Sequence, residues 1–168
     1  MYANMNAMHL SANKTYEVQR TNNFEVVFAN LGANAQTLAL AVTSFSGLNQ
    51  SNSSISLSYQ NANVKVAGQA QTSSVTLVVK DLITADVEAI VRDWRRTVYN
   101  DETGEIGFAQ DYKKAGTLYE YSPDGSYVRA WKLIGCWPES IDYGSFSYDS
   151  NGAREISITI SVDQAYRE

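Results

Sequence analysis

The chain of 168 residues, 18.6 kDa, is long enough for one domain with a hydrophobic core. Charged residues make up 18% of it, below the roughly 25% typical of globular domains, and the net charge of −5 argues against a nucleic-acid-binding surface, which needs clustered Lys and Arg. No apolar run is long enough to cross a bilayer and the first residues lack a signal peptide, so we expect no membrane anchor and synthesis in the cytoplasm.

Charge is spread unevenly along the chain. Residues 1–80 carry four basic and two acidic side chains, whereas residues 81–168 carry nine basic and sixteen acidic ones. Between Val26 and Val79 the only formally charged residue is Lys65, in a segment rich in Ser, Asn and Gln. The low overall charge indicates that something other than water covers part of the protein, and this segment is polar yet nearly uncharged.

The N-terminal region shows no periodic pattern before the first strand. Residues 1–21 are interpreted as an N-terminal arm, and residues 22–168 as a single β domain. Apolar side chains alternate over residues 24–28, which predicts a strand, and a second candidate strand covers residues 38–42 with its leucines and valine on one face.

The clearest half-apolar strand follows, because residues 55–60 alternate strictly between apolar and polar side chains. After a turn-prone triplet at 61–63, residues 64–67 are predicted to return as the second arm of a hairpin. The Ser and Asn content alone would also fit a disordered linker, but the alternation argues against one. The apolar run at 75–79 is typical of a buried strand.

One helix is expected over about residues 84–97, with Thr84 as its N-cap and an apolar face that packs on the sheet. Glu88 and Arg92 have the spacing of an ion pair on its outer face. The residues that follow, 99–116, are rich in Gly and charge and are interpreted as an outward connection.

The remaining strands lie in the C-terminal half. A strand at 118–121 is predicted to turn through residues 122–125, where Pro and Gly occupy positions suited to a type I turn, and to return at 127–133. A second turn at 149–152 leads into the strictly alternating strand 156–162.

These elements predict a mainly β fold of about eight strands and one helix. Their order does not alternate strand and helix, so the sheets should be antiparallel. We therefore expect an antiparallel β-sandwich or flattened barrel with one flanking helix.

Residues for catalysis are scarce. His9 is the only histidine and Cys136 the only cysteine, which argues against a Ser-His-Asp triad, a metal centre or an internal disulfide. The carboxylates Asp101, Glu102 and Glu105 could in principle form a hydrolase site, and the eleven tyrosines could line a carbohydrate-binding face. Nothing in the sequence buries those carboxylates, and burial is what would raise the pKa of one of them for catalysis. We therefore expect that the chain is not an enzyme and binds no cofactor or metal. A carbohydrate-binding module remains as an alternative.

Six short stretches follow one another in an order that carries more information than any of them alone. They are Asn-Phe-Glu-Val at 23–26, Asn-Val-Lys-Val-Ala-Gly at 63–68, Asp-Trp at 93–94, Asp-Tyr-Lys-Lys-Ala at 111–115, Leu-Ile-Gly-Cys-Trp-Pro at 133–138 and Tyr-Asp-Ser-Asn-Gly at 148–152. In this order, from about residue 22 to the C-terminus, the chain resembles the tail tube proteins of contractile-tailed bacteriophages. The Trp137-Pro138 element and the later Asp-Ser-Asn turn are the most specific part of the likeness.

The resemblance implies a structural subunit of the virion tail. Six copies would close into a ring with one continuous inner β-barrel, and rings would stack into a tube inside a contractile sheath, through which DNA passes without specific binding. The implied partners are further copies of the chain, the sheath, baseplate, tail terminator and tape measure proteins. The likeness also fits the inner tube of a contractile injection device or a type VI secretion system, which delivers protein.

Two sets of site residues follow from this resemblance. Candidates for the channel wall or for contacts between rings are Ser56, Ser58, Gln60 and Lys65. Candidates for an outward face toward the sheath, where exposed ionic contacts are weak, are Glu88, Arg92, Arg95, Arg96, Asp101, Glu102 and Glu105.

Overall fold

The computed structural model describes residues 17–168, so His9 and most of the expected arm at 1–21 lie outside the described residues. The strands are β1 (Phe24–Phe28), β2 (Val42–Ser46), β3 (Gln50–Tyr59), β4 (Ala62–Thr72), β5 (Val75–Lys80), β6 (Tyr99–Asn100), β7 (Glu105–Ile106), β8 (Lys114–Tyr121), β9 (Tyr127–Asp142), β10 (Glu155–Ser161) and β11 (Gln164–Arg167). The helices are α2 (Asn34–Ala41), α3 (Val87–Val98) and α4 (Ala109–Tyr112). The described chain therefore has more elements than the sequence predicted, chiefly short ones.

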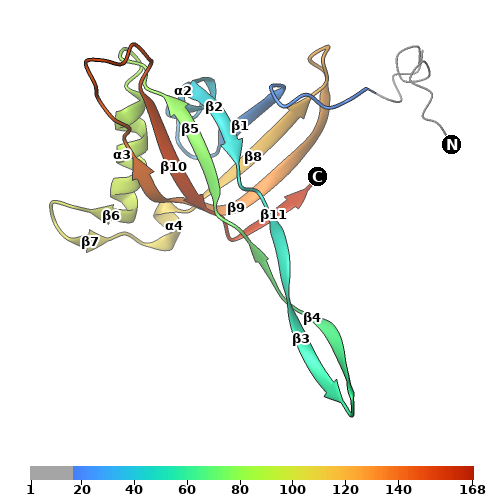
Figure 1. Cartoon of the computed structure of the whole chain (residues 1–168). Coiled ribbons are helices and arrows are strands. Elements are labelled where there is room, and N and C mark those ends of the chain that lie inside the picture. Colours follow the sequence, from blue (N-terminus) through green and yellow to red (C-terminus); the bar gives the residue numbers. More distant parts are fainter. Residues whose placement is uncertain (1–16) are drawn as a thin grey trace.

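Two antiparallel sheets share the long strand β9 (Figure 1). Its first half pairs with β8 on one side and β11 on the other, and β1 pairs with the far side of β8. Its second half pairs with β10, which is followed by β5 and then β2. Between the two halves Gly135 has a φ of +71°, and a Cβ at this position would collide with the Asp163 carboxylate. Glycine therefore allows one strand to bend from the first sheet into the second.

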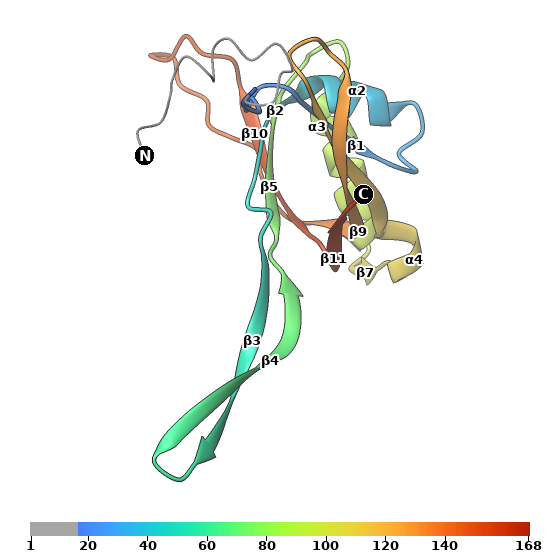
Figure 2. The same cartoon turned by 90° about the vertical axis from the view of Figure 1, so that its right-hand side faces the viewer.

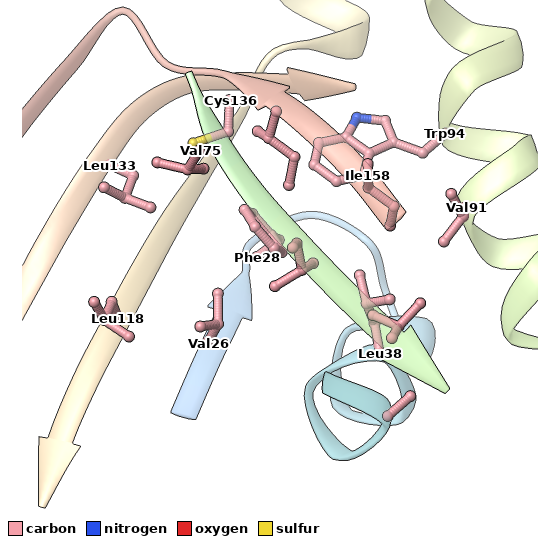
Figure 3. Packing of buried hydrophobic residues seen from close by; sticks show 14 of the residues in the cluster. Val26, Phe28, Leu38, Val75, Val91, Trp94, Leu118, Leu133, Cys136 and Ile158 are labelled. Carbon is pink, nitrogen blue, oxygen red and sulfur yellow. The ribbon is translucent and has the colours of Figure 1, made fainter. Parts of the chain in front are cut away.

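The hydrophobic core lies between the two sheets, and α2 and α3 close it (Figure 3). Every second residue of β5 and of β10 points into it, as the sequence predicted: Val75, Leu77, Val79, Ile156, Ile158 and Ile160. The rings of Phe28 and Trp94 pack with their centroids 5.2 Å apart, and the Trp94 indole nitrogen donates a hydrogen bond to the Tyr112 carbonyl over 2.9 Å. An antiparallel sandwich with a flanking helix is thus confirmed.

The flanking helix α3 begins later than predicted. Asp86, not Thr84, is its N-cap, and the Asp86 side chain accepts a hydrogen bond from the backbone nitrogen of Ala89 over 3.1 Å. Asp86 has a φ of +45°, a left-handed conformation that Asp tolerates better than most residues. It is the last residue of the loop that precedes α3. The predicted apolar face is confirmed, because Val87, Ile90, Val91 and Trp94 are all buried.

The expected strand at 38–42 is wrong for most of its length. Residues up to Ala41 form α2, in which Leu38 and Ala41 are buried and Leu40 is exposed, and β2 begins only at Val42. Leucines separated by alanines fit both the two-residue period of a strand and the 3.6-residue period of a helix. Because Ala and Leu have high helix propensity, the segment forms a helix.

The connection at 99–116 is more ordered than expected. It contains the short β6–β7 hairpin and the single-turn helix α4, and β8 already begins at Lys114. The turn at 122–125 is confirmed, with the Gly125 nitrogen donating to the Ser122 carbonyl over 2.9 Å.

Candidate assembly surfaces

The hairpin formed by β3 and β4 projects far from the rest of the subunit (Figure 2). It continues the β2–β5 pair of the second sheet, since β2 leads into β3 and β4 leads back into β5. Its two-residue turn lies at Gln60 and Asn61, one residue before the predicted triplet, and Gln60 has a φ of +51°. The hairpin predicted from the alternation is therefore confirmed, but it does not lie against the core.

The register of the hairpin sorts its side chains onto two faces. Ile55 lies opposite Val66 and Leu57 opposite Val64, so these residues share one face, with Tyr59 nearest the turn. We call Ile55, Leu57, Tyr59, Val64 and Val66 the apolar hairpin face. All five are exposed, with Leu57 at 50% and Tyr59 at 75%. An isolated two-stranded hairpin is only marginally stable in water, so this face requires a partner to cover it.

The candidate channel or ring-contact residues lie on the opposite side of the same hairpin. Ser56 is directly opposite Lys65, which places these two predicted residues together, and Ser58 is opposite Asn63. Gln60 is in the turn and not on the strand. This polar side of the hairpin is exposed as well.

A second surface lies on the outer face of the second sheet. Four strands bring two rows of side chains together there, namely Ser44, Val78, Ser157 and Asp142 in one row and Ser46, Thr76, Thr159 and Ser140 in the other. We call these eight residues the polar sheet face. It carries a single formal charge, on Asp142. Sequence reasoning did not identify this surface. The only signal for it in β10 is that Ser and Thr residues alternate with the isoleucines.

The second sheet also has two free edges within residues 17–168. The outer edge of β2 pairs with no described strand, and residues 137–142 of β9 pair only with β10. A cavity of about 540 Å³ lined by Phe24, Val26, Val42 and Phe45, among others, separates β1 from β2, so the sandwich does not close into a barrel by itself. Exposed sheet edges are templates for pairing with another chain.

The candidate outward residues form two groups, one around the C-terminal end of α3 and the β6–β7 hairpin, and the other, Glu88 and Arg92, nearer the start of α3. Near the C-terminal end of α3, Arg96 pairs with Glu102 over 3.2 Å and Arg95 lies over the ring of Tyr99 at 5.7 Å. Glu105 accepts a hydrogen bond from the Thr103 hydroxyl, and Asp101 is exposed.

The expected pair between Glu88 and Arg92 is not formed. Glu88 instead binds Arg154 at 2.6 Å, and Arg92 lies 3.7 Å from Asp93. The partner of Glu88 comes from a distant part of the chain, and helix spacing alone could not reveal it.

Nothing in the described residues resembles a reaction centre. No group of three or more His, Cys, Asp or Glu side chains within 17–168 could hold a metal ion. Burial raises the pKa of the Cys136 thiol to about 12, so it remains protonated and unreactive at neutral pH. None of the helices in this part of the chain is long and apolar enough to span a membrane.

Comparison with solved structures shows the same fold in contractile injection systems. A chain of the PVC sheath–tube complex in its extended state, from an extracellular contractile injection system, matches with a TM-score of 0.72 and 18% identity, covering 100% of this chain and 99% of that one. A chain of the anti-feeding prophage tube-terminating cap matches with a TM-score of 0.70 and 20% identity, covering 90% and 91%. A chain of the anti-feeding prophage baseplate matches with a TM-score of 0.70 and 15% identity, covering 90% and 95%. No curated protein sequence matches the chain.

The fold and its uncovered surfaces define a mainly β protein whose open sheet edges and exposed apolar hairpin face are suited to contacts with other chains. The chain belongs to the T4-like virus tail tube protein gp19 family, whose model matches residues 20–165. It is thus a tail tube protein and not an enzyme.

Proposed function

We propose that the chain builds the inner tube of a contractile phage tail, as stacked hexameric rings through which DNA is ejected. The observation that carries this proposal is the combination of the nearly uncharged polar sheet face with free edges on both sides of the same sheet. Membership of a virus tail tube family supports the phage context.

In this proposal the free edge of β2 in one subunit pairs with residues 137–142 of β9 in the next. Six such pairings close the second sheet into one continuous inner barrel, which removes the edges that a lone subunit leaves open. The polar sheet face then lines the channel. Serine and threonine hydroxyls stay hydrated without holding phosphate groups, because tight phosphate binding needs Lys or Arg. DNA therefore passes without being retained.

The other surfaces take complementary roles. The apolar hairpin face is covered by other copies of the chain, and the charged side of α3 and the β6–β7 hairpin face outward to the sheath. Baseplate, terminator and tape measure proteins meet the ends and the lumen of the tube. Structural matches to chains from sheath–tube, cap and baseplate assemblies support this arrangement.

The channel assignment is tested by adding positive charge to the polar sheet face. We expect the Ser157→Lys and Thr159→Lys double variant to form normal tubes by electron microscopy but to slow DNA ejection from assembled phage, because lysines in the wall bind phosphate. The control variant Ala109→Lys with Gln110→Lys, at two exposed positions of α4, adds the same two positive charges away from this face and should eject DNA normally. Wild-type ejection by the double variant would contradict the channel assignment.

A second candidate is the inner tube of a protein-delivering injection device. The observation in its favour is the full-length match to a chain of an extracellular contractile injection system. Purified particles that contain this chain distinguish the two. We expect DNA-filled capsids on the tails, whereas capsid-free particles loaded with protein would support the injection device.

A further inference from the structure

Two pairs of neighbouring residues in this sequence can cyclise without a catalyst. The side chain of an Asn or Asp that precedes glycine is open to attack by the glycine backbone nitrogen, because glycine has no Cβ to shield that nitrogen. The sequence has one Asp-Gly pair, Asp124-Gly125, and one Asn-Gly pair, Asn151-Gly152. Both lie in segments that the sequence predicted as turns, 122–125 and 149–152.

The fold holds the Asp124-Gly125 pair in a fixed geometry. The Gly125 nitrogen donates to the Ser122 carbonyl over 2.9 Å. The Asp124 carboxylate accepts hydrogen bonds from the Ser126 backbone nitrogen over 3.0 Å and from the Ser126 hydroxyl over 2.6 Å. Both groups that would have to react are therefore already engaged, and the turn must open before they can meet.

The Asn151-Gly152 pair is exposed and unrestrained. It lies in the loop 143–154, which joins β9 to β10 at the end of the subunit opposite the hairpin (Figure 1). Among residues 17–168, no hydrogen bond involves the Asn151 side chain or the Gly152 nitrogen. A Cβ added at Gly152 would have one neighbour within 4 Å, the Ser150 hydroxyl oxygen at 3.8 Å. The two reacting groups can thus meet without breaking a contact of the described fold.

The base of the same loop is fixed by Arg154. Its guanidinium contacts Asp81 at 2.9 Å and Glu88 at 2.6 Å. Its Nε donates to the Tyr143 carbonyl over 2.9 Å. These contacts join the two ends of the loop to each other and to the start of α3. A reaction at position 151 therefore changes the charge of the loop and leaves its attachment to the fold intact.

We infer that Asn151 is a site of spontaneous deamidation. The Gly152 nitrogen attacks the Asn151 side-chain carbon Cγ. A new C–N bond forms, the bond from Cγ to the side-chain nitrogen breaks, and this nitrogen leaves as ammonia with the proton of Gly152. Water then opens the resulting succinimide ring at either carbonyl, which leaves aspartate or isoaspartate at position 151. Water is the only further reactant.

The reaction adds a negative charge to a segment that has no spare cation. Residues 142–155 carry three acidic side chains and one basic side chain, Arg154, which is already paired. The new carboxylate is ionised at neutral pH, so the net charge of the chain changes from −5 to −6. If the chain forms the proposed tube, every copy in a ring can carry this charge, and rings of different age then differ in charge. This consequence rests on the proposed function, whereas the modification itself does not.

Incubation of the folded protein in mildly alkaline buffer, followed by proteolysis and mass spectrometry, tests the site. We expect the peptide that contains residue 151 to gain the mass difference between an amide and a carboxylic acid, and to separate into aspartate and isoaspartate forms. Gly152→Ala adds a shielding Cβ without a clash, and Asn151→Gln would have to close a larger ring, so both variants should stay unmodified over the same time. An unmodified wild-type peptide, or equal rates in wild type and Gly152→Ala, would overturn the inference.

The same incubation in urea tests the structural part of the argument. Asn151 should react at nearly the same rate in the folded and the unfolded chain, because the fold does not restrain it. Asp124 should form isoaspartate more slowly in the folded chain than in the unfolded chain, by roughly tenfold or more, because its turn must first lose its hydrogen bonds. If folding slowed Asn151 as much as Asp124, the loop would protect the site and the inference would be wrong. Neither measurement depends on tube assembly, so its failure is distinct from failure of the proposed function.

Discussion

Single side chains decide where the elements of this subunit begin. Asp86 adopts a left-handed backbone conformation and caps α3, although Thr84 is an equally good cap by residue type. Sequence reasoning could not choose between them, because the choice depends on how the 81–86 loop leaves β5. The loop is fixed by hydrogen bonds to Arg154 and Leu82, which are contacts of the folded state.

This difference gives a direct test at residue scale. We expect Asp86→Ala to lower the free energy of unfolding by about 0.5–2 kcal/mol, because α3 loses its capping hydrogen bond. Thr84→Ala should have a much smaller effect, since the Thr84 side chain does not cap the helix. Urea unfolding followed by circular dichroism measures both. A larger loss of unfolding free energy for Thr84→Ala than for Asp86→Ala would show that Thr84 caps the helix, as the sequence predicted.

A second residue-scale prediction concerns alkaline pH. The Tyr121 hydroxyl donates a hydrogen bond to Glu25 over 2.8 Å, and this bond to a carboxylate raises the pKa of Tyr121 to about 12, followed by burial and the charge of Glu25. In the unfolded chain a tyrosine loses its proton near pH 10. The folded state therefore binds more protons between these values, so the stabilisation is present below pH 10 and is lost as the pH rises toward 12.

Tyr121→Phe removes this dependence. At neutral pH we expect the variant to be less stable than wild type by about 1 kcal/mol or less, the usual net value of one hydrogen bond. Between pH 10 and 12 wild type should lose stability more steeply than the variant. Equal slopes in pH-dependent unfolding curves would show that the Tyr121–Glu25 bond does not persist in solution.

At the scale of elements, alternation in the sequence was the most informative signal. It correctly predicted β1, β10 and the projecting hairpin, while β5 was predicted from its short continuous apolar run. It failed for α2, where the Leu and Ala residues fit the period of a strand as well as that of a helix. It could not show that β9 belongs to two sheets, since that depends on the bend at Gly135 and its fit to Asp163.

The core strands carry the element-scale prediction. Ile158 is fully buried between the sheets, so Ile158→Ala should lower the free energy of unfolding by about 2–5 kcal/mol through lost burial and the cavity that remains. Ile106→Ala, at a position that is 77% exposed, is the matched control and should cost little. Chemical denaturation of both variants measures the difference. Equal losses would mean that β10 is not a core strand.

For the whole molecule, the sequence predicted that the uncharged segment between Val26 and Val79 serves contacts between copies. The structure locates the faces that make such contacts possible. The two hairpin faces were readable from strand alternation alone, whereas the polar sheet face needs the lateral register of four strands that are far apart in the sequence. The alternation within β10 shows the polar side of that strand, but it does not show which strands lie beside it.

The two faces of the hairpin should respond differently to substitution. Ile55→Ser with Leu57→Ser removes apolar surface that is already half exposed in the single subunit, so the thermal midpoint of the subunit should hardly change. Stacking should be lost, because each of these side chains contributes up to about 1.5–3 kcal/mol when it is fully covered. Electron microscopy and thermal unfolding of the same preparation measure both effects.

The opposite face has its own variant, Ser56→Lys with Ser58→Lys and Gln60→Lys. If this face contributes to the channel or to contacts between rings, the added charges, repeated in every copy of a ring, should disturb tube assembly or DNA ejection through mutual repulsion and desolvation. Normal tubes and normal ejection from this variant would exclude the polar hairpin face from both roles. If the double variant of the apolar face, Ile55→Ser with Leu57→Ser, nevertheless failed to stack, the contact between rings would be carried by the apolar face alone.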